Sequence, residues 1–229
     1  MLQNLKRGID RELGTPPKQA LPITNEILLS IKCHLSPWIS ADIAFWAACL
    51  IGYYGFLRKS TLLSKTLLKS EEKCLLRRDM TMPSNDLAVL YVRHTKTIQF
   101  GEKVLKIPFV ACKNVELCPL QALKNLFIVC SKNTNDPLFS YRRGTEISWW
   151  THQSFVKKLR LLLAKTGLDE NLYSGHSFRR GGATLAFQRG LSITHVKQRG
   201  DWLSSAVENY IYVNANQLND VASVLINGK

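Results

Sequence analysis

The sequence predicts a mainly α-helical domain with a small three-stranded antiparallel sheet, which is an α+β fold. Segments with apolar residues at helical spacing lie in both halves of the chain, and short alternating or β-branched segments lie between them at 74–110. No internal repeat or low-complexity segment is visible. With 229 residues, of which 45% are hydrophobic, the chain is large enough for one core of ordinary size with short extensions.

The N-terminal part predicts a linker followed by two helices. Residues 2–13 have the spacing of a few exposed helical turns, and Gly14 with three nearby prolines predicts an extended linker after them. Residues 1–20 are thus either the end of something upstream or an arm that crosses a partner. The hydroxyl of Thr24 is a suitable cap for the first helix. The second helix, predicted at 41–54, is apolar nearly all round and therefore buried, and it ends at Gly55.

The middle of the chain predicts the sheet and two more helices. Three segments separated by turn residues, CLLRRDM, LAVLYVRH and KVLKIPFV, are typical of strands. The stretch 118–130 predicts an amphipathic helix with a proline in its first turn, and 131–148 predicts a loop with a short extended piece at 138–139. A further helix is predicted at 149–166, whose basic residues either solvate its surface or follow a DNA backbone.

The charge balance indicates a polyanionic partner. The chain holds 31 lysines and arginines against 17 aspartates and glutamates, a formal net charge of +14 at pH 7. Such an excess favours nucleic acid over a membrane as the partner, although it says nothing about the fold.

The cysteines and the apolar runs predict a soluble protein of a reducing, intracellular compartment. The six cysteines form no C-x-x-C pair and no metal-ligand spacing, and several lie in apolar runs as small core residues. The N-terminus lacks the apolar segment of a secretory signal, and the longest apolar run is too short to span a bilayer.

The stretch 173–213 carries the first candidate site residues. His176 and Arg179 lie three apart and therefore share one face of a predicted helix, close to its positive end. Ser174 or Ser177 is positioned to cap that end. The pair is either a phosphate grip or a chance pair on a surface helix.

Two more basic candidates lie earlier in the chain. Arg58 follows the end of a buried helix, where it is either a fixed phosphate ligand or an arginine that bonds the last helix carbonyls. Lys96 lies near the tip of the second predicted hairpin, where it either reaches into a groove or is solvated.

Trp202, Tyr210 and Tyr212 complete the candidates. A turn at Gly200 is predicted to bring Trp202 back towards the helix that carries Arg179. On a helix the two tyrosines diverge by about 200°, so only one of them faces the site.

Taken together, these residues resemble a known family. The order and approximate spacing of six positions resemble the tyrosine recombinases, the phage-integrase superfamily, over about residues 20–213: Arg58, Lys96, His176, Arg179, Trp202 and Tyr210. The match is strongest in GHSFRRGGATLAFQRG, in GDW with a tyrosine eight residues after the tryptophan, and in RHTKT. This spacing, and the tryptophan in place of the commoner histidine, are most similar to recombinases of crypton- and DIRS-type mobile elements.

The resemblance implies the DNA breaking-rejoining catalytic fold and its chemistry. The Tyr210 hydroxyl would attack a DNA phosphodiester to form a 3′-phosphotyrosine, and Lys96 would protonate the leaving 5′-oxygen. Rejoining needs no ATP because the covalent link keeps the energy of the broken bond. No metal and no cofactor are implied.

The remaining matched residues would stabilise the transition state. By the resemblance Arg58 and Arg179 would clamp the non-bridging phosphate oxygens. His176 would assist as an acid, base or hydrogen-bond donor, and Trp202 would pack and donate its indole N–H. The family commonly carries an acidic residue where this chain has Thr61.

The resemblance also carries expectations for organisation, partners and location. It divides the chain into a linker or remnant of an upstream core-binding domain at 1–20, a catalytic domain at 21–213 and a tail helix at 214–229. The partners would be double-stranded DNA and further copies of the chain, as a dimer or tetramer on DNA. The location would be the nucleus for a eukaryotic mobile element, and otherwise the cytoplasm or nucleoid. The alternative function is that of a catalytically inactive, DNA-binding descendant.

Overall fold

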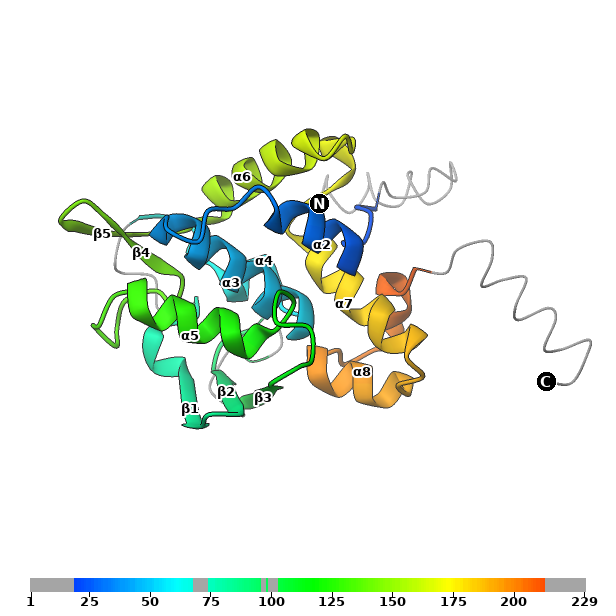
Figure 1. Ribbon diagram of the computed structural model, residues 1–229. Helices are drawn as coiled ribbons and strands as arrows, with labels where there is room; N and C mark the ends of the chain where they lie inside the picture. Colours follow the sequence, from blue (N-terminus) through cyan, green and yellow to red (C-terminus); the bar gives the residue numbers. More distant parts are fainter. Residues whose placement is uncertain (1–18, 68–73, 96–97, 99–102, 213–229) are drawn as a thin grey trace, which may run out of the picture.

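Helix α3 (Ser40–Tyr54) is the central element, and the other helices and both sheets pack around it (Figure 1). The computed structural model describes residues 19–67, 74–95, 98 and 103–212. Within these residues α3 contacts α5 (Pro119–Val129) on one side and α7 (His176–Gln188) on the other. This mainly helical arrangement confirms the predicted fold class.

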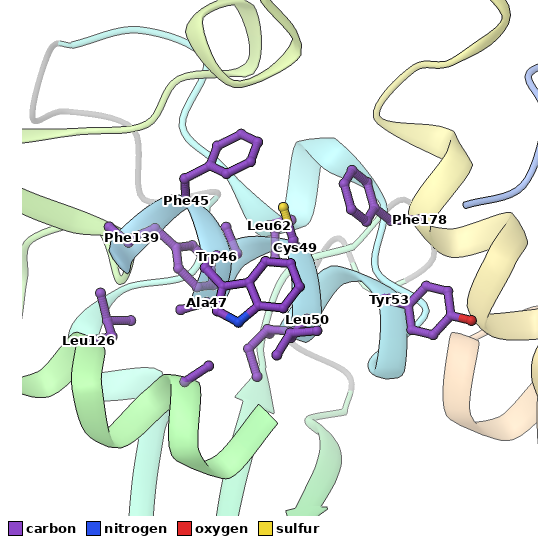
Figure 2. Packing of buried hydrophobic residues seen from close by; sticks show 14 of the residues in the cluster. Phe45, Trp46, Ala47, Cys49, Leu50, Tyr53, Leu62, Leu126, Phe139 and Phe178 are labelled. Atoms are coloured by element: carbon purple, nitrogen blue, oxygen red, sulfur yellow. The ribbon is translucent and has the colours of Figure 1, made fainter. Parts of the chain in front are cut away.

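The hydrophobic core forms along α3, as its apolar sequence predicts. Almost every α3 residue from Ala44 to Tyr53 is buried, and Figure 2 shows the side chains between α5 and Phe178 of α7. The one acidic residue of α3, Asp42, is also buried and pairs with Lys158 at 3.1 Å. That lysine of the basic helix α6 (His152–Lys165) therefore has a structural partner.

The predicted three-stranded antiparallel sheet is present, in the order β1-β2-β3. Its strands are β1 (Met80–Ser84), β2 (Leu87–Val92) and β3 (Leu105–Val110). The prediction of the first strand at CLLRRDM was wrong, because Arg77–Asp79 form a 3₁₀ turn, η1. The Asp79 carboxylate closes that turn by accepting the Leu76 N–H at 2.9 Å, so the strand begins only afterwards.

The segment predicted as a loop contains a second hairpin. Strands β4 (Ser140–Arg143) and β5 (Glu146–Trp149) pair antiparallel, and Gly144 takes the turn with a φ of 64°. The following helix, α6, consequently begins at His152 and not at Trp149, and its cap is Thr151, whose hydroxyl accepts the Ser154 N–H.

The other helices largely follow their sequence signals. Helix α2 (Asn25–Lys32) is capped by Thr24, and α5 has Pro119 in its first turn, as predicted. The remaining short elements are α4 (Lys59–Leu62), η2 (Glu170–Leu172), α8 (Ile193–Gly200) and η3 (Ser205–Tyr210).

Close packing of α7 on α3 depends on two adjacent glycines. A Cβ on Gly181 would lie 1.9 Å from the Ile23 carbonyl oxygen, and one on Gly182 would lie 2.0 Å from that of Tyr53. Only glycine leaves room for these carbonyls. The GG pair after Arg180 therefore sets how closely the helix that bears Arg179 approaches the core.

Some of the predictions concern residues that the structure does not describe. The linker at 1–20 and the tail at 214–229 lie almost wholly outside the described residues, as does Lys96.

All six cysteines are free thiols, and four of them are buried. In the described part of the chain, no helix has the length and apolar character that crossing a membrane requires.

Candidate active site

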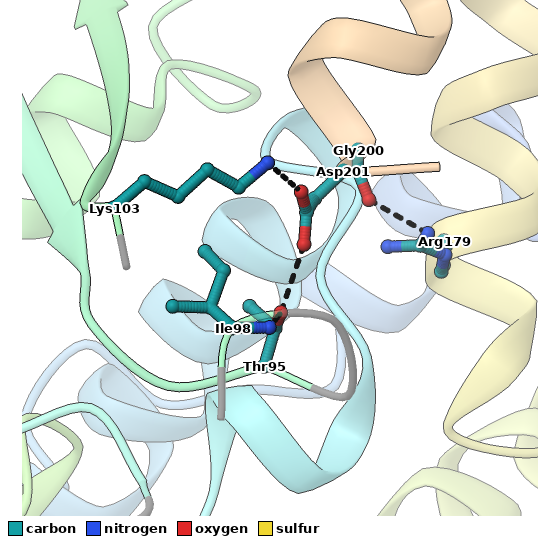
Figure 3. A network of polar contacts seen from close by, with 6 residues as sticks. All are labelled: Thr95, Ile98, Lys103, Arg179, Gly200 and Asp201. Carbon is teal, nitrogen blue, oxygen red and sulfur yellow. Dashed lines mark hydrogen bonds and ion pairs between the residues drawn. The ribbon is translucent and has the colours of Figure 1, made fainter. Parts of the chain in front are cut away.

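Arg179 lies at the centre of the candidate site. Arg179 is only 2% exposed, and its guanidinium donates to the backbone oxygen of Phe56. It also donates, at 2.8 Å, to the backbone oxygen of Gly200 (Figure 3). Its Nε–H has no partner among the described residues. The two carbonyls fix the guanidinium between the end of α3 and the end of α8.

Both carbonyl acceptors lie at or next to a strained backbone position. Phe56, with a φ of 50°, and Asp201, with a φ of 54°, are the non-glycine residues with positive φ in the described part of the chain. A left-handed conformation costs a non-glycine residue about 1–2 kcal/mol. Such strain persists where the surrounding structure enforces it, and here it flanks the seat of Arg179 on both sides.

Trp202 and Tyr210 cover the Arg179 guanidinium. Its central carbon lies 3.6 Å from the centroid of the Trp202 ring and 5.3 Å from that of Tyr210. The two rings meet edge-on at 5.2 Å. The predicted return of Trp202 towards Arg179 is thus confirmed. The buried Trp202 Nε1 has no hydrogen-bond partner among the described residues, which leaves its N–H available to a ligand.

Arg58 and His176 face an open cleft of about 460 Å³. Arg58 is half-buried at the start of α4, and its guanidinium makes no hydrogen bond or ion pair within the described residues. His176 is the first residue of α7. The cleft is lined by Arg58, Ser60, Thr61, His94, Thr95, His176 and Tyr210. Within this lining there is no carboxylate to neutralise the basic groups.

The positive groups act on one another. Partial burial of the ring, followed by the charges of Lys59, Arg179 and Arg58, lowers the pKa of His176 below its ordinary value. Burial, and then the charge of Arg58, lowers the pKa of Arg179 to about 9, whereas Tyr210 and the charge of Asp201 act in the opposite direction. Arg179 stays charged at neutral pH, and a bound anion would relieve the repulsion within this cluster.

The structure separates Tyr210 from Tyr212. Tyr210 lines the cleft with Arg58 and His176, whereas the Tyr212 ring lies 5.8 Å from the Arg180 guanidinium, in a different hollow. Thr184 of α7 fixes this arrangement, because its hydroxyl bonds both the Tyr210 carbonyl oxygen and the Tyr212 N–H. Of the two tyrosines, Tyr210 is therefore the one placed beside Arg179.

Other sequence candidates have structural positions of their own. The guanidinium of Arg180 points away from Arg179 and donates to the side chain of Gln19 and to the Ala20 carbonyl oxygen. Thr61, where an acidic residue is common in the resembled family, is a largely buried part of the cleft lining. The described residues contain no cluster of ligands suited to a metal ion.

Sequence reasoning missed the residues that hold Arg179 and Trp202. The carbonyls of Phe56 and Gly200 carry no side-chain signal. Gly200 is needed for a second reason, because a Cβ there would lie 1.8 Å from the Trp202 ring. Asp201 stands inside the GDW motif, and its neighbours Thr95 and Lys103 lie about 100 positions away, so no local pattern connects them.

The fold is that of the tyrosine recombinase catalytic domain. A structure of the XerH site-specific recombinase bound to palindromic difH substrate, a post-cleavage complex, superposes with a TM-score of 0.62 at 18% identity. The alignment covers 90% of this chain and 54% of that one. A structure of the XerA recombinase gives a TM-score of 0.61 at 16% identity, over 91% of this chain and 64% of that one.

One curated relative supports the same class from sequence. The chain is 26% identical to an "integrase/recombinase xerD homolog" of Selenomonas ruminantium, over 92% of this chain and 59% of the relative. The chain thus spans less than two thirds of that relative's length. No family model matches the chain.

Proposed function

We propose that this chain is the catalytic domain of a site-specific DNA recombinase or integrase that cleaves and rejoins strands through a 3′-phosphotyrosine intermediate. One observation carries the proposal: Tyr210 lies against the buried Arg179 and in one cleft with Arg58 and His176, a cleft lined by no carboxylate. A hydroxyl nucleophile surrounded by cations suits attack on a phosphodiester. DNA is also the ligand of similar structures, such as the XerH complex with difH.

In this proposal the Tyr210 oxygen forms the new bond to phosphorus while the bond to the 5′-oxygen breaks. Lys96 is the acid that gives the leaving oxygen its proton. Arg58 and Arg179 stabilise the extra negative charge of the pentacoordinate phosphorus. The reverse step, attack by a 5′-hydroxyl on the phosphotyrosine, rejoins the strand without ATP.

His176 and Trp202 assist the same step. The lowered pKa favours the neutral form of His176, which can take the proton that leaves Tyr210. The unpartnered Trp202 N–H is available as a further donor to the phosphate.

The nucleophile is tested by comparing Tyr210→Phe with Tyr212→Phe on a nicked suicide substrate, where the cleaved strand diffuses away. Tyr210→Phe should abolish the covalent protein–DNA adduct on a denaturing gel, because it removes the attacking oxygen, while DNA affinity stays within about two-fold. Tyr212→Phe is the matched control and should keep the adduct.

Two outcomes would contradict the proposal. An adduct that persists in Tyr210→Phe and disappears in Tyr212→Phe would move the nucleophile. An unchanged chain that binds duplex DNA yet never forms an adduct would favour the non-catalytic descendant.

We further propose an origin in a crypton- or DIRS-type mobile element, supported by the tyrosine eight residues after Trp202. Double-stranded DNA and other copies of the chain are the proposed partners, as a dimer or tetramer on DNA. The nucleus is the proposed location for a eukaryotic element, and the cytoplasm or nucleoid otherwise. The mass of the complex on DNA, measured by sedimentation, tests the assembly.

A further inference from the structure

A buried carboxylate lies directly behind the candidate active site. Asp201 is 5% exposed and follows Gly200, whose carbonyl holds Arg179 (Figure 3). The next residue is Trp202, whose ring covers the Arg179 guanidinium. Asp201 also has one of the two left-handed non-glycine conformations in the described residues. A buried charge in a strained backbone position is costly, so its contacts require an explanation.

Both carboxylate oxygens of Asp201 bond to the segment that joins β2 to β3. The Thr95 hydroxyl donates to Oδ2 at 2.8 Å, and the Lys103 ammonium pairs with Oδ1 at 2.7 Å. Thr95 is itself fixed, because its N–H donates to the Ile98 carbonyl oxygen at 3.1 Å and its hydroxyl accepts the Ile98 N–H at 3.0 Å. Asp201 thus joins two segments that are about 100 residues apart in the sequence.

These two segments form different walls of the same site. Thr95 lines the cleft together with His94, Arg58 and Tyr210. On the other side, the backbone next to Asp201 is rigid, because the Trp202 N–H donates to the Lys197 carbonyl oxygen at 3.0 Å. A displacement of the Asp201 carboxylate would therefore shift Thr95, in the cleft lining, relative to the Arg179 guanidinium.

We infer that Asp201 is a positioning residue that holds Thr95, just after the end of β2, in place relative to Arg179 and Trp202, with Lys103 as its charged partner. The inference rests on the proposed function, because it concerns the geometry of the cleavage step. Asp201 need not touch DNA. Its negative charge also offsets part of the repulsion around Arg179, since it acts to raise the pKa of that guanidinium.

Asp201→Gly tests the inference, because it removes the side chain while glycine accepts the left-handed backbone without strain. Adduct formation on the suicide substrate is followed under single turnover at saturating DNA. We expect the rate to fall about ten-fold, the scale of a sub-ångström misplacement, with the DNA Kd within about two-fold of the unchanged chain. Thermal unfolding confirms that the variant is folded.

Lys103→Met is the second variant, and it lies on the surface, where the Lys103 side chain is 51% exposed. It should slow the same step, Lys103→Arg should restore it, and the double variant with Asp201→Gly should be no slower than Asp201→Gly alone. Lys106→Met is the matched control, because it removes the same charge from an exposed position on β3 that does not contact Asp201.

The outcomes separate this inference from the proposed function. An unchanged chain without adduct formation would overturn both. An active chain in which Asp201→Gly cleaves at the normal rate would overturn the inference alone. The inference alone would also be overturned if Lys103→Met slowed cleavage no more than Lys106→Met does. Additive effects of Asp201→Gly and Lys103→Met on the cleavage rate would overturn it as well.

Discussion

At the scale of single residues, the site is defined by positive charges held close together without a carboxylate in the cleft. Burial lowers the pKa of both His176 and Arg179. The charges of Lys59, Arg179 and Arg58, in that order, lower the pKa of His176 further, and the charge of Arg58 lowers that of Arg179 further. Repulsion of this kind destabilises the free protein slightly and favours a bound anion. A bound phosphate relieves that repulsion, and this relief strengthens its binding.

Lys59→Met tests this charge cluster. Since the charge of Lys59 disfavours a proton on His176, its removal should raise the pKa of His176 towards the value of a solvated histidine. The pKa is measured by NMR titration of the imidazole carbon signals in the free protein. Lys113→Met, which removes a charge elsewhere on the surface, is the control.

A pKa of His176 that is unchanged or lower in Lys59→Met would contradict this electrostatic account. A rise in both variants would indicate a general effect of net charge and not a local one.

At the scale of elements, the site depends on how closely α7 approaches the end of α3. Gly181 and Gly182 let the backbone carbonyls of Ile23 and Tyr53 touch the helix. The same approach brings Arg179 within reach of the Phe56 carbonyl. The close packing of α7 on α3 therefore also sets the position of the Arg179 guanidinium.

Gly182→Ala should destabilise the fold strongly, because the added methyl group would lie 2.0 Å from the Tyr53 oxygen and 2.7 Å from the Phe56 ring. We expect a loss of about 3 kcal/mol in the free energy of unfolding, from overpacking, and a Tm lower by roughly 6–12 °C. Thermal unfolding followed by circular dichroism measures it. Gln188→Ala, at the exposed end of the same helix, is the control and should change the Tm little.

The elements that periodicity describes were predictable, and those that depend on distant contacts were not. The buried α3, the cap Thr24 and the three-stranded sheet all follow local rules. The β4–β5 hairpin was missed because SYRRGTEISW lacks a clear apolar alternation. The start of β1 was misplaced because Asp79 forms a local turn with Leu76.

At the scale of the whole molecule, the net charge of +14 predicts DNA binding that weakens steeply with salt. Arg58 should contribute one phosphate contact. In Arg58→Gln the slope of log Kd against log salt should therefore fall by about one, and binding should weaken similarly on unrelated sequences. Fluorescence anisotropy over a salt series measures both.

Arg142→Gln makes the same substitution on the β4–β5 hairpin, which lies at the opposite end of the molecule from α7 and α8 (Figure 1). It should leave the slope nearly unchanged. An equal loss of slope in both variants would mean that Arg58 acts only through net charge.

Of the candidate site, the sequence predicted the side chains better than their supports. The structure brings Arg58, His176, Arg179, Trp202 and Tyr210 together, while Lys96 lies outside the described residues. The contacts made by the backbone carbonyls and by Asp201 form only in the folded chain, so no local sequence pattern predicts them.

The two backbone carbonyls that hold Arg179 restrict which residues evolution can place at this position. A lysine carries its donors on one nitrogen and has no planar fork, so it cannot reproduce the geometry in which Nη1 meets the Phe56 oxygen and Nη2 meets the Gly200 oxygen. The exchange that is usually mildest between basic residues would therefore weaken the contacts to these two carbonyls in the protein interior. Orthologues of this chain that abandon arginine here would have to rebuild the ends of α3 and α8 as well.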